Sequence, residues 1–472
     1  MRCTLFFIAA LSVSVPSAIA GPIEDQQTPP ASRSVDRIPD TATAARLARE
    51  GQRLSAEQAK ALEVRLETTP DDLPARARLL GYYFATAIKV GGPEATRAAR
   101  RRHILWMIAH HPENDLTALP ECTIDRAGHA LADADGYGQA RTLWLDQVRQ
   151  RNDDVRVLLH AAAFFRLSDK ALALTLLKQA VRLAPSDNDI ASRLGYTYAI
   201  SVLGITMINN NGLPMAANPA DAAGEAAQTA INDLRVSSNP VVVAVAGSVL
   251  SQYGAIVGAL TKGAINQDAL AEELLVRATT LSPNDPALSR ALSQFYALRM
   301  MSARSPEERV ALARKSLAQA EMVVERTTSD REAHAEALNA ASKAAMEAAA
   351  IDKARRFATD LLKLVADRRD NMYGQYFHDV HVVLGRVSLK DGNVEQAKTH
   401  LLEAGGTTGG GTLTSFGPNM SLAKELADRG ERSTVMAYLE LCRRFWQGPQ
   451  LNQWIQTLKS GQVPNFGANL TY

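Results

Sequence analysis

One segment of the chain matches another 98 residues further on, and this internal repeat constrains the fold more than any other feature of the sequence. When residues 173–199 are laid over residues 271–297 without gaps, ten of the twenty-seven positions are identical. Self-similarity at a fixed spacing is typical of repeat architectures, in which one small unit is stacked many times. The first copy contributes the matched residues Ala173, Leu176, Leu177, Ala180, Leu183, Pro185, Asp187, Leu194, Tyr198 and Ala199.

Each copy has the pattern of two helices joined by a short turn. Ala173, Leu177 and Ala180 are spaced by four and three residues, so they lie along one face of a helix. Pro185 prevents that helix from continuing, and Asp187 can accept hydrogen bonds from the first amides of the next one. The pattern therefore predicts helix, turn and helix, with small alanines that let a neighbouring helix approach closely.

These residues resemble the tetratricopeptide repeat (TPR), a 34-residue pair of helices with small residues and a proline at set positions. In that register one unit ends near Pro185 and the next opens with Leu194, Gly195 and Tyr198. The resemblance implies an all-α fold, an irregular TPR-like α-solenoid of antiparallel helix pairs. Similar landmarks recur elsewhere, at Leu80, Gly81 and Phe84 and at Leu384, Gly385, Gly392, Ala397, Leu401 and Ala404.

The chain departs from the repeat pattern in several places. Gly409 stands where the late unit would usually have proline, and Ser388 where an aromatic residue is usual. The landmarks at Leu80, Leu194 and Leu384 are not separated by multiples of 34 residues, so insertions or divergent units must interrupt the array. The C-terminal segment, which ends in "NFGANLTY", is similar to that of a group of uncharacterised bacterial exported proteins.

The N-terminus has the three parts of a secretory signal peptide. Arg2 provides a positive charge, an apolar run extends from Leu5 to Val15, and "AIA" precedes Gly21 as a cleavage site. We expect cleavage after Ala20 and export, most simply to the periplasm and otherwise to the extracellular space. The polar, proline-rich residues 21–40 predict a disordered tether.

The rest of the chain divides by composition into helical repeats and two interruptions. Asn, Gly and Pro are frequent from Met207 to Gly224, which predicts a long loop. Glycine is frequent from Gly405 to Asn419, which predicts a second, flexible loop. Capping patterns at Ser55–Gln58 and Ser305–Glu308 mark helix starts. The predicted boundaries are 1–20 signal peptide, 21–40 tether, 41–203 N-terminal repeats, 204–265 loop insertion plus apolar helix, 266–404 repeats, 405–420 Gly-rich loop, and 421–472 C-terminal helices with an extended tail.

Residues 241–260 carry no charge over twenty positions, which is long enough for a membrane span. Ser248, Ser251 and Gln252 weaken that interpretation, and no cluster of Lys or Arg flanks the segment. A helix buried between its neighbours in an array is also apolar all round. We favour the buried helix, and membrane association through 241–260 is the alternative.

Composition excludes some classes of partner. The chain has 52 basic and 50 acidic residues, so its charge is nearly balanced, and no basic stretch is interleaved with aromatic residues. Nucleic acid is therefore not an expected partner. The mature chain is too long for one ordinary core, whereas a solenoid of helix pairs can grow without that limit.

No motif in the sequence predicts catalysis, and we expect neither an enzyme nor a cofactor. The Gly-rich loop lacks the Lys and Ser or Thr of a phosphate-binding P-loop. His378 and His381 share a helical face but lack the rest of a zinc motif, so we expect structural roles and no metal site. Cys122 and Cys442 lie far apart in the sequence, which favours free, buried thiols over a disulfide.

The sequence favours an exported scaffold that binds a protein or peptide through the concave face of its helical array. In related repeats the first helix of each unit lines that face. The repeat register carries this role to six candidate partner-binding residues, Ser192, Tyr196, Arg290, Gln294, Asp379 and Arg386.

Two alternatives remain open. The chain could be an envelope protein that binds a small ligand, or an enzyme, with a site formed by the segments 207–224 and 405–419, because long loops in compact chains are often functional. It could also be a membrane-tethered scaffold that uses residues 241–260.

Overall fold

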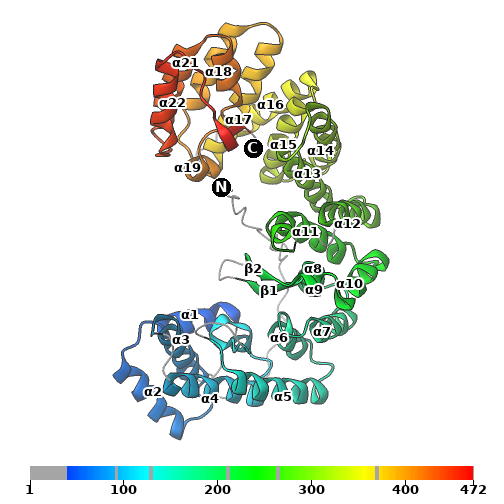
Figure 1. The fold of residues 1–472 in the computed structure, drawn as a ribbon, viewed down its shortest axis with the longest axis vertical. Coiled ribbons are helices and arrows are strands. Elements are labelled where there is room, and N and C mark those ends of the chain that lie inside the picture. The colour runs from blue at the N-terminus through cyan, green and yellow to red at the C-terminus, as the bar shows by residue number, and fades with distance from the viewer. Residues whose placement is uncertain are drawn as a thin grey trace. The chain divides into compact units, whose positions relative to one another are not determined.

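The computed structural model describes residues 40–90, 94–126, 131–208, 213–261, 266–366 and 371–470. The predicted signal peptide and almost all of the predicted tether lie outside these residues. The described chain is all-α apart from one short hairpin, and its 22 α-helices pack mainly as consecutive antiparallel neighbours (Figure 1). The predicted TPR-like helical fold is confirmed.

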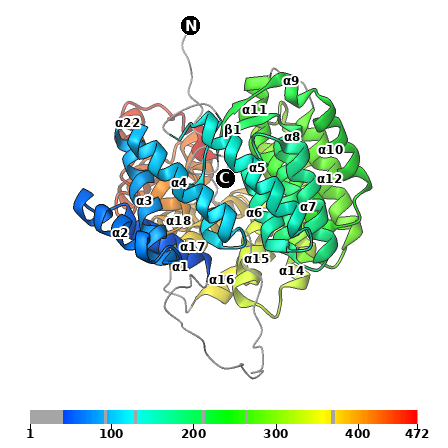
Figure 2. The same cartoon turned by 90° about the horizontal axis from the view of Figure 1, so that it is seen from below.

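The chain divides into two compact units, and the boundary along the chain falls between Leu274 and Leu275, within one helix. The first unit covers residues 22–274. In it most helices from α2 to α11 pack against the next one, α1 packs against α3, and α7 and α8 lie side by side (Figure 2). Its helices are α1 (Thr41–Gly51), α2 (Ala56–Thr68), α3 (Leu73–Val90), α4 (Glu94–His110), α5 (Ala134–Gln150), α6 (Val155–Phe165), α7 (Lys170–Leu183), α8 (Asn188–Val202), α9 (Pro219–Ala222), α10 (Glu225–Val236), α11 (Pro240–Thr261) and the first half of α12 (Gln267–Leu281), up to Leu274.

An insertion separates the two helices of one pair in this unit. After α8 the chain forms an antiparallel hairpin of β1 (Ile205–Ile208) and β2 (Pro214–Ala217), and then the short helix α9. The hairpin lies beside α8 and α11, as Figure 1 shows. The long loop predicted at 207–224 is thus partly regular structure in its described residues, because Asn218 caps α9 and the strands pair with each other.

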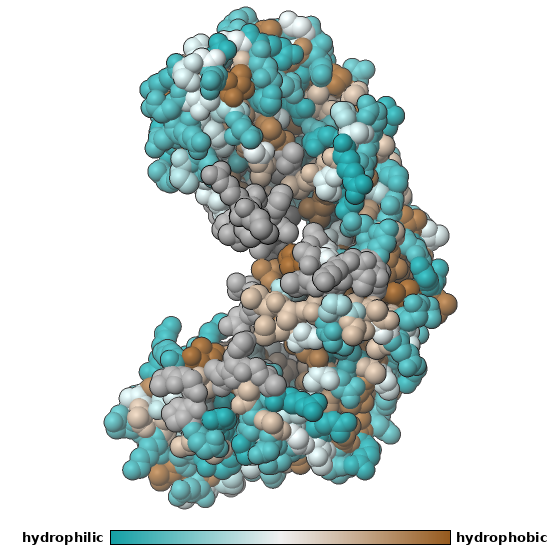
Figure 3. Space-filling view, viewed as in Figure 1, coloured by the Kyte–Doolittle hydropathy of each residue, from teal (hydrophilic) through white to brown (hydrophobic). Residues whose placement is uncertain are grey.

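The second unit contains residues 275–472 and is mostly hydrophilic on the face that Figure 3 shows. Its core between α14 and α17 is mostly alanine with some valine and leucine, and near the C-terminus Trp446, Trp454 and Phe466 pack together in a second cluster. Its helices after α12 are α13 (Pro286–Met301), α14 (Pro306–Arg326), α15 (Arg331–Glu347), α16 (Ile351–Val365), α17 (Asn371–Lys390), α18 (Val394–Gly405), α19 (Thr412–Phe416), α20 (Ser421–Asp428), α21 (Arg432–Cys442) and α22 (Gln450–Lys459).

Helix starts follow the side chains that cap them. Asp187 accepts hydrogen bonds from the first amides of α8, as the sequence predicts. Ser55 and Gln58 form the predicted reciprocal capping box. At the start of α14, Ser305 accepts a bond from Glu308 N, but the Glu308 carboxylate accepts from Arg304 N, one residue before the cap. The returning bond of the predicted capping box is therefore made by Arg304 N, and not by the N-cap residue Ser305.

The three Leu-Gly landmarks lie where one helix approaches another closely. A β-carbon at Gly81 would be 1.9 Å from Ala48 O on α1, and one at Gly195 would be 2.4 Å from Val242 O on α11. At Gly385 it would be 2.3 Å from Leu422 Cδ2, in the first turn of α20. Glycine lets the backbones of α3 and α8 approach their neighbours with almost no side chain between, and it lets the Leu422 side chain pack directly against α17.

The apolar segment 241–260 is the helix α11, which packs against α8 and β2. Val242, Val243, Ala246 and Leu250 are buried against these neighbours within the unit. Among the helices that the structure describes, none is long and apolar enough for a membrane span. The burial supports the interpretation of 241–260 as a packing helix.

The Gly-rich segment is packed, which differs from the flexible loop expected from its composition. Thr407 Oγ1 donates to Gly374 O at 2.8 Å. Gln375 Oε1 accepts hydrogen bonds from Thr412 N, Thr412 Oγ1 and Leu413 N, at 3.1, 2.8 and 3.3 Å. A composition rich in glycine shows only that the backbone can turn, whereas α17 supplies the partners that hold it in place.

We predict that Gly195→Ala lowers the free energy of unfolding by about 2 kcal/mol or more, because the added methyl group collides with the backbone of α11. Gly138 on α5 is the matched control, since a β-carbon there has no heavy atom within 4 Å. Gly138→Ala should raise stability by about 0.5–1 kcal/mol. Urea unfolding measures both, and equal stability of the two variants would contradict the close approach at Gly195.

Candidate protein-binding surface

The six candidate residues lie on helices that are the first of their pairs, as the repeat register predicts. Ser192 and Tyr196 are on α8, in the unit of residues 22–274. The other four are on α13 and α17, in the unit of residues 275–472. The two groups are described separately below, because each belongs to its own unit.

On α8, Tyr196 contacts both neighbouring first helices. The Arg166 guanidinium, just after α6, lies 5.6 Å from the centroid of the Tyr196 ring. Tyr253 on α11 forms a side-chain hydrogen bond with Tyr196, and burial together with this contact raises the pKa of Tyr253 to about 12. Tyr196 remains half-buried, and Ser192 beside it donates only to Asn188 O of its own helix. Tyr196 thus joins α6, α8 and α11 while keeping part of its ring accessible.

On α13, the two candidates remain accessible. Arg290 Nη1 lies 3.3 Å from Glu336 Oε2 on α15, and the two side chains are 32% and 48% exposed. Gln294, one turn further along α13, is exposed. These positions therefore combine a charge pair of both signs with an exposed amide.

Asp379 on α17 is buried and fully engaged. Asn339 Nδ2, Lys343 Nζ and Gln375 Nε2 each donate to its carboxylate at 3.1 Å, and His378 Nδ1 lies 3.3 Å away. Burial acts to raise the pKa of Asp379, but the Lys343 charge and these donors outweigh it and hold the pKa well below its usual range. The side chain is only 1% exposed, so its role here is to join α15 and α17.

Arg386 is the centre of a charge network that spans four helices. Its Nη1 lies 2.7 Å from Glu347 Oε1 on α15, and its Nε lies 2.7 Å from Glu425 Oε1 on α20. Arg309 on α14 also binds Glu347, at 2.7 Å. Burial acts to lower the pKa of Arg386, but the two carboxylates raise it overall. Burial likewise acts to raise the pKa of Glu347, while Arg386 and Arg309 lower it overall.

Four of the six candidates, Tyr196, Arg290, Asp379 and Arg386, share one geometric property, which is that their contacts connect successive first helices. In one unit α6, α8 and α11 are connected, and in the other α13, α15, α17 and α20 are connected. The sequence register locates one end of each contact, but it does not identify the partner residue, which lies about one repeat away. The partners missed by the sequence reasoning are Arg166, Tyr253, Arg309, Glu336, Asn339, Lys343, Glu347 and Glu425.

The two histidines considered for a metal site have protein partners. His378 Nε2 lies 2.9 Å from the Tyr438 hydroxyl, and His381 Nδ1 lies 3.0 Å from His400 Nδ1. Burial, with the neighbouring imidazoles, lowers the pKa of His381 to about 4, so the His381 ring is neutral at pH 7. Within the part of the chain that the structure describes, no three His, Cys, Asp or Glu side chains gather as metal ligands would.

Cys122 and Cys442 are free and buried, Cys122 in one unit and Cys442 in the other. Burial raises the pKa of each thiol to about 12. A thiol in this state is the protonated, weakly nucleophilic form at neutral pH. Both therefore act as small apolar side chains.

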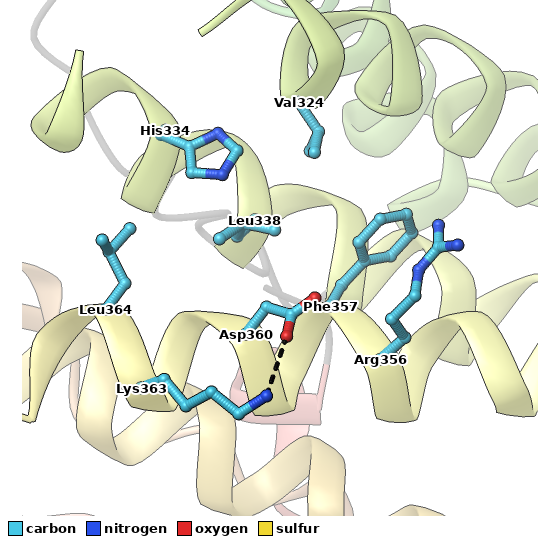
Figure 4. Close-up of a pocket in the computed structure, with 8 residues that line it drawn as sticks. All are labelled: Val324, His334, Leu338, Arg356, Phe357, Asp360, Lys363 and Leu364. Atoms are coloured by element: carbon cyan, nitrogen blue, oxygen red, sulfur yellow. Dashed lines mark hydrogen bonds and ion pairs between the residues drawn. The ribbon is translucent and has the colours of Figure 1, made fainter. Parts of the chain in front are cut away.

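Each unit has a pocket between helices. A cavity of about 470 Å³ lies between α10 and α12, and residues 222–224 of the insertion line one side of it. Arg235 and Glu273 form an ion pair at 2.7 Å on its wall. A second cavity, of about 500 Å³, lies among α14, α15 and α16 (Figure 4). The predicted alternative site combined segments 207–224 and 405–419, which belong to different units.

Comparisons with known proteins give structural matches alone. No protein-family model matches the chain, and no curated protein matches it. A human IFIT1 dimer with m7Gppp-AAAA aligns with a TM-score of 0.33 and 15% identity, covering 90% of this chain and 89% of that one. Cut9–Hcn1 of the APC/C aligns with a TM-score of 0.23 and 12% identity, covering 89% of this chain and 87% of that one. Yeast Tom70 aligns with a TM-score of 0.22 and 12% identity, covering 86% of this chain and 96% of that one. The superpositions are loose, and nothing about function follows from them.

We predict that Arg386→Met lowers the free energy of unfolding at pH 7 by about 2–3 kcal/mol, because it leaves Glu347 and Glu425 partly buried without their shared cation. Glu347 has a lowered pKa when folded, so its stabilising effect is complete above the ordinary carboxyl range and is lost as the pH falls through the folded pKa. The difference between wild type and variant should therefore shrink on acidification below about pH 4.

Arg355→Met is the control for this experiment. Arg355 pairs with Asp391 at 2.9 Å, but both side chains are more than 40% exposed. The substitution should change stability by less than about 1 kcal/mol. Urea unfolding from pH 7 to pH 3 measures both variants, and a pH-independent effect of Arg386→Met would contradict the assignment to Glu347.

Proposed function

We propose that this protein is an exported scaffold without catalytic activity of its own, which binds a protein or peptide partner through the surface of its first helices. In the repeats that the sequence resembles, the first helices line the concave face of the array, and we propose the same for this chain. The observation that supports the proposal most directly is that, within each unit, contacts between first helices hold polar side chains in fixed positions, and several of these side chains are accessible. We call these contacts the first-helix row of each unit.

The accessible members of the row have the composition of a recognition surface. Tyr196 and Arg166 offer an aromatic ring and a guanidinium, the residue types enriched in binding hot spots. Arg290, Glu336 and Gln294 offer both charges and an amide. Because contacts with neighbouring helices already order several of these side chains, binding would cost less conformational entropy. Asp379 is buried and joins α15 to α17 beneath the accessible side chains.

The test is affinity capture from the native envelope with the mature chain, residues 21–472, followed by mass spectrometry for proteins and small molecules. Ser192→Arg and Gln294→Arg each place a long cation on the first-helix surface without breaking a contact to another helix. We expect a stoichiometric protein partner whose capture falls at least tenfold in one of these variants. Arg386 is unsuitable for this purpose, because its reversal would place three carboxylates together.

Thr175→Arg on α7 and Thr399→Arg on α18 are the matched controls, since both threonines are exposed on second helices and bond only to their own helix. They should retain the partner. If all four variants retain it equally, the partner does not bind the first-helix surface. If only a small molecule is retained, the ligand-binding alternative gains support, and the cavity between α10 and α12 becomes its best candidate site.

Export is a separate part of the proposal, which rests on the N-terminal sequence. A full-length chain expressed in a host with two membranes should appear in the periplasmic fraction with Gly21 as its first residue. N-terminal sequencing of the fractionated protein measures this. Full-length protein in the cytoplasmic fraction would contradict export and leave the binding proposal intact.

A further inference from the structure

The cavity among α14, α15 and α16 has an apolar floor and a charged rim. Leu338 and Phe357 are buried in its floor, and Val324 and Leu364 are half-buried at its sides. Figure 4 shows His334, Arg356, Asp360 and Lys363 around this floor, from α15 and α16. The volume of about 500 Å³ is within the range of pockets that bind small ligands or anchoring side chains.

Arg356 is the unusual member of the rim. Of the four basic residues of α16, Lys353 binds Glu321, Arg355 binds Asp391 and Lys363 binds Asp360. Arg356 is exposed and forms no ion pair with any residue that the structure describes. Its guanidinium instead lies 4.6 Å from the centroid of the Phe357 ring. The stacked position fixes a cation directly beside the apolar floor.

The rim therefore has an excess of positive charge. Asp360 is the acidic lining residue, and Lys363, 3.3 Å away, balances it. Arg356 remains unbalanced, and His334 adds a polar ring whose Nδ1 lies 3.3 Å from Thr327 Oγ1. Guanidinium groups bind carboxylates in a two-pronged geometry, which adds specificity to the attraction.

We propose that this cavity docks an acidic peptide segment of a partner protein, with an apolar side chain on the floor and a neighbouring carboxylate on Arg356. The apolar floor and the unbalanced guanidinium together fit such a segment. The exposed side chains of the rim leave one side of the cavity accessible, so a peptide backbone can pass along it. This site lies between α14, α15 and α16 and shares none of its lining residues with the first-helix row.

The experiment is a fluorescence anisotropy titration with the mature chain and a fluorescein-labelled peptide, Ac-Glu-Glu-Phe-Glu-Glu-Leu-Glu-Glu-amide, at about 0.1 M salt, where long-range charge effects are partly screened. We expect saturable binding that weakens at least tenfold in Arg356→Glu. A peptide with Lys in place of every Glu, and one with Ala in place of Phe and Leu, should each bind at least tenfold more weakly.

Arg355→Glu is the matched control, because it makes the same change in net charge on the neighbouring residue, outside the cavity lining. It should change affinity less than twofold. Equal weakening by both variants would overturn the proposal in favour of a general charge effect. Absence of peptide binding by the wild type would also overturn it. Binding of 4-phenylbutyrate that depends on Arg356, without binding of the peptide, would overturn the peptide as occupant. Circular dichroism establishes that both variants fold.

Discussion

The arrangement of this protein depends on how closely its helices can approach one another. At Gly81, Gly195 and Gly385 a methyl group would overlap the neighbouring helix or its side chains, at distances of 1.9–2.4 Å. Dispersion and burial increase steeply with such close contact, so these crossings contribute stability that larger residues would prevent. At Gly81 and Gly195 the approach is backbone to backbone, which leaves α3 and α8 little freedom to slide against their neighbours.

Charge pairing then connects successive first helices in the unit of residues 275–472. Arg386 binds carboxylates on the helices before and after its own, while Asp379 collects donors from α15 and α17. Such contacts are between residues about 36 to 40 positions apart in the chain, roughly one repeat. A one-dimensional stack gains stability mainly from these neighbour contacts, so each helix pair depends on the next. Removing the charge of Arg386 should therefore destabilise the neighbouring helix pairs as well as its own.

The sequence predicts the features that arise locally, and misses those that need the third dimension. The cap at Asp187, the box at Ser55 and the Leu-Gly landmarks follow from residues a few positions apart, and the structure confirms each cap. The register also identifies which helices would hold the candidate residues. It gives no information on burial depth, however, so Asp379 and Gln294 were equivalent in sequence although one is buried and the other exposed. Pairing across helices, as between Arg386 and Glu425, has no signal in a single sequence.

Gln375 has a consequence for how the second unit opens. Its amide nitrogen donates to the buried Asp379, while its oxygen accepts three hydrogen bonds from the Gly-rich segment. If this segment detached, the oxygen would lose its partners inside a buried region, and the support of the carboxylate would loosen with it. A stretch whose composition suggests mobility is thus tied to a buried charge. Its amides should exchange with solvent only when α17 itself opens, so the segment and that helix form one cooperative unit of local unfolding.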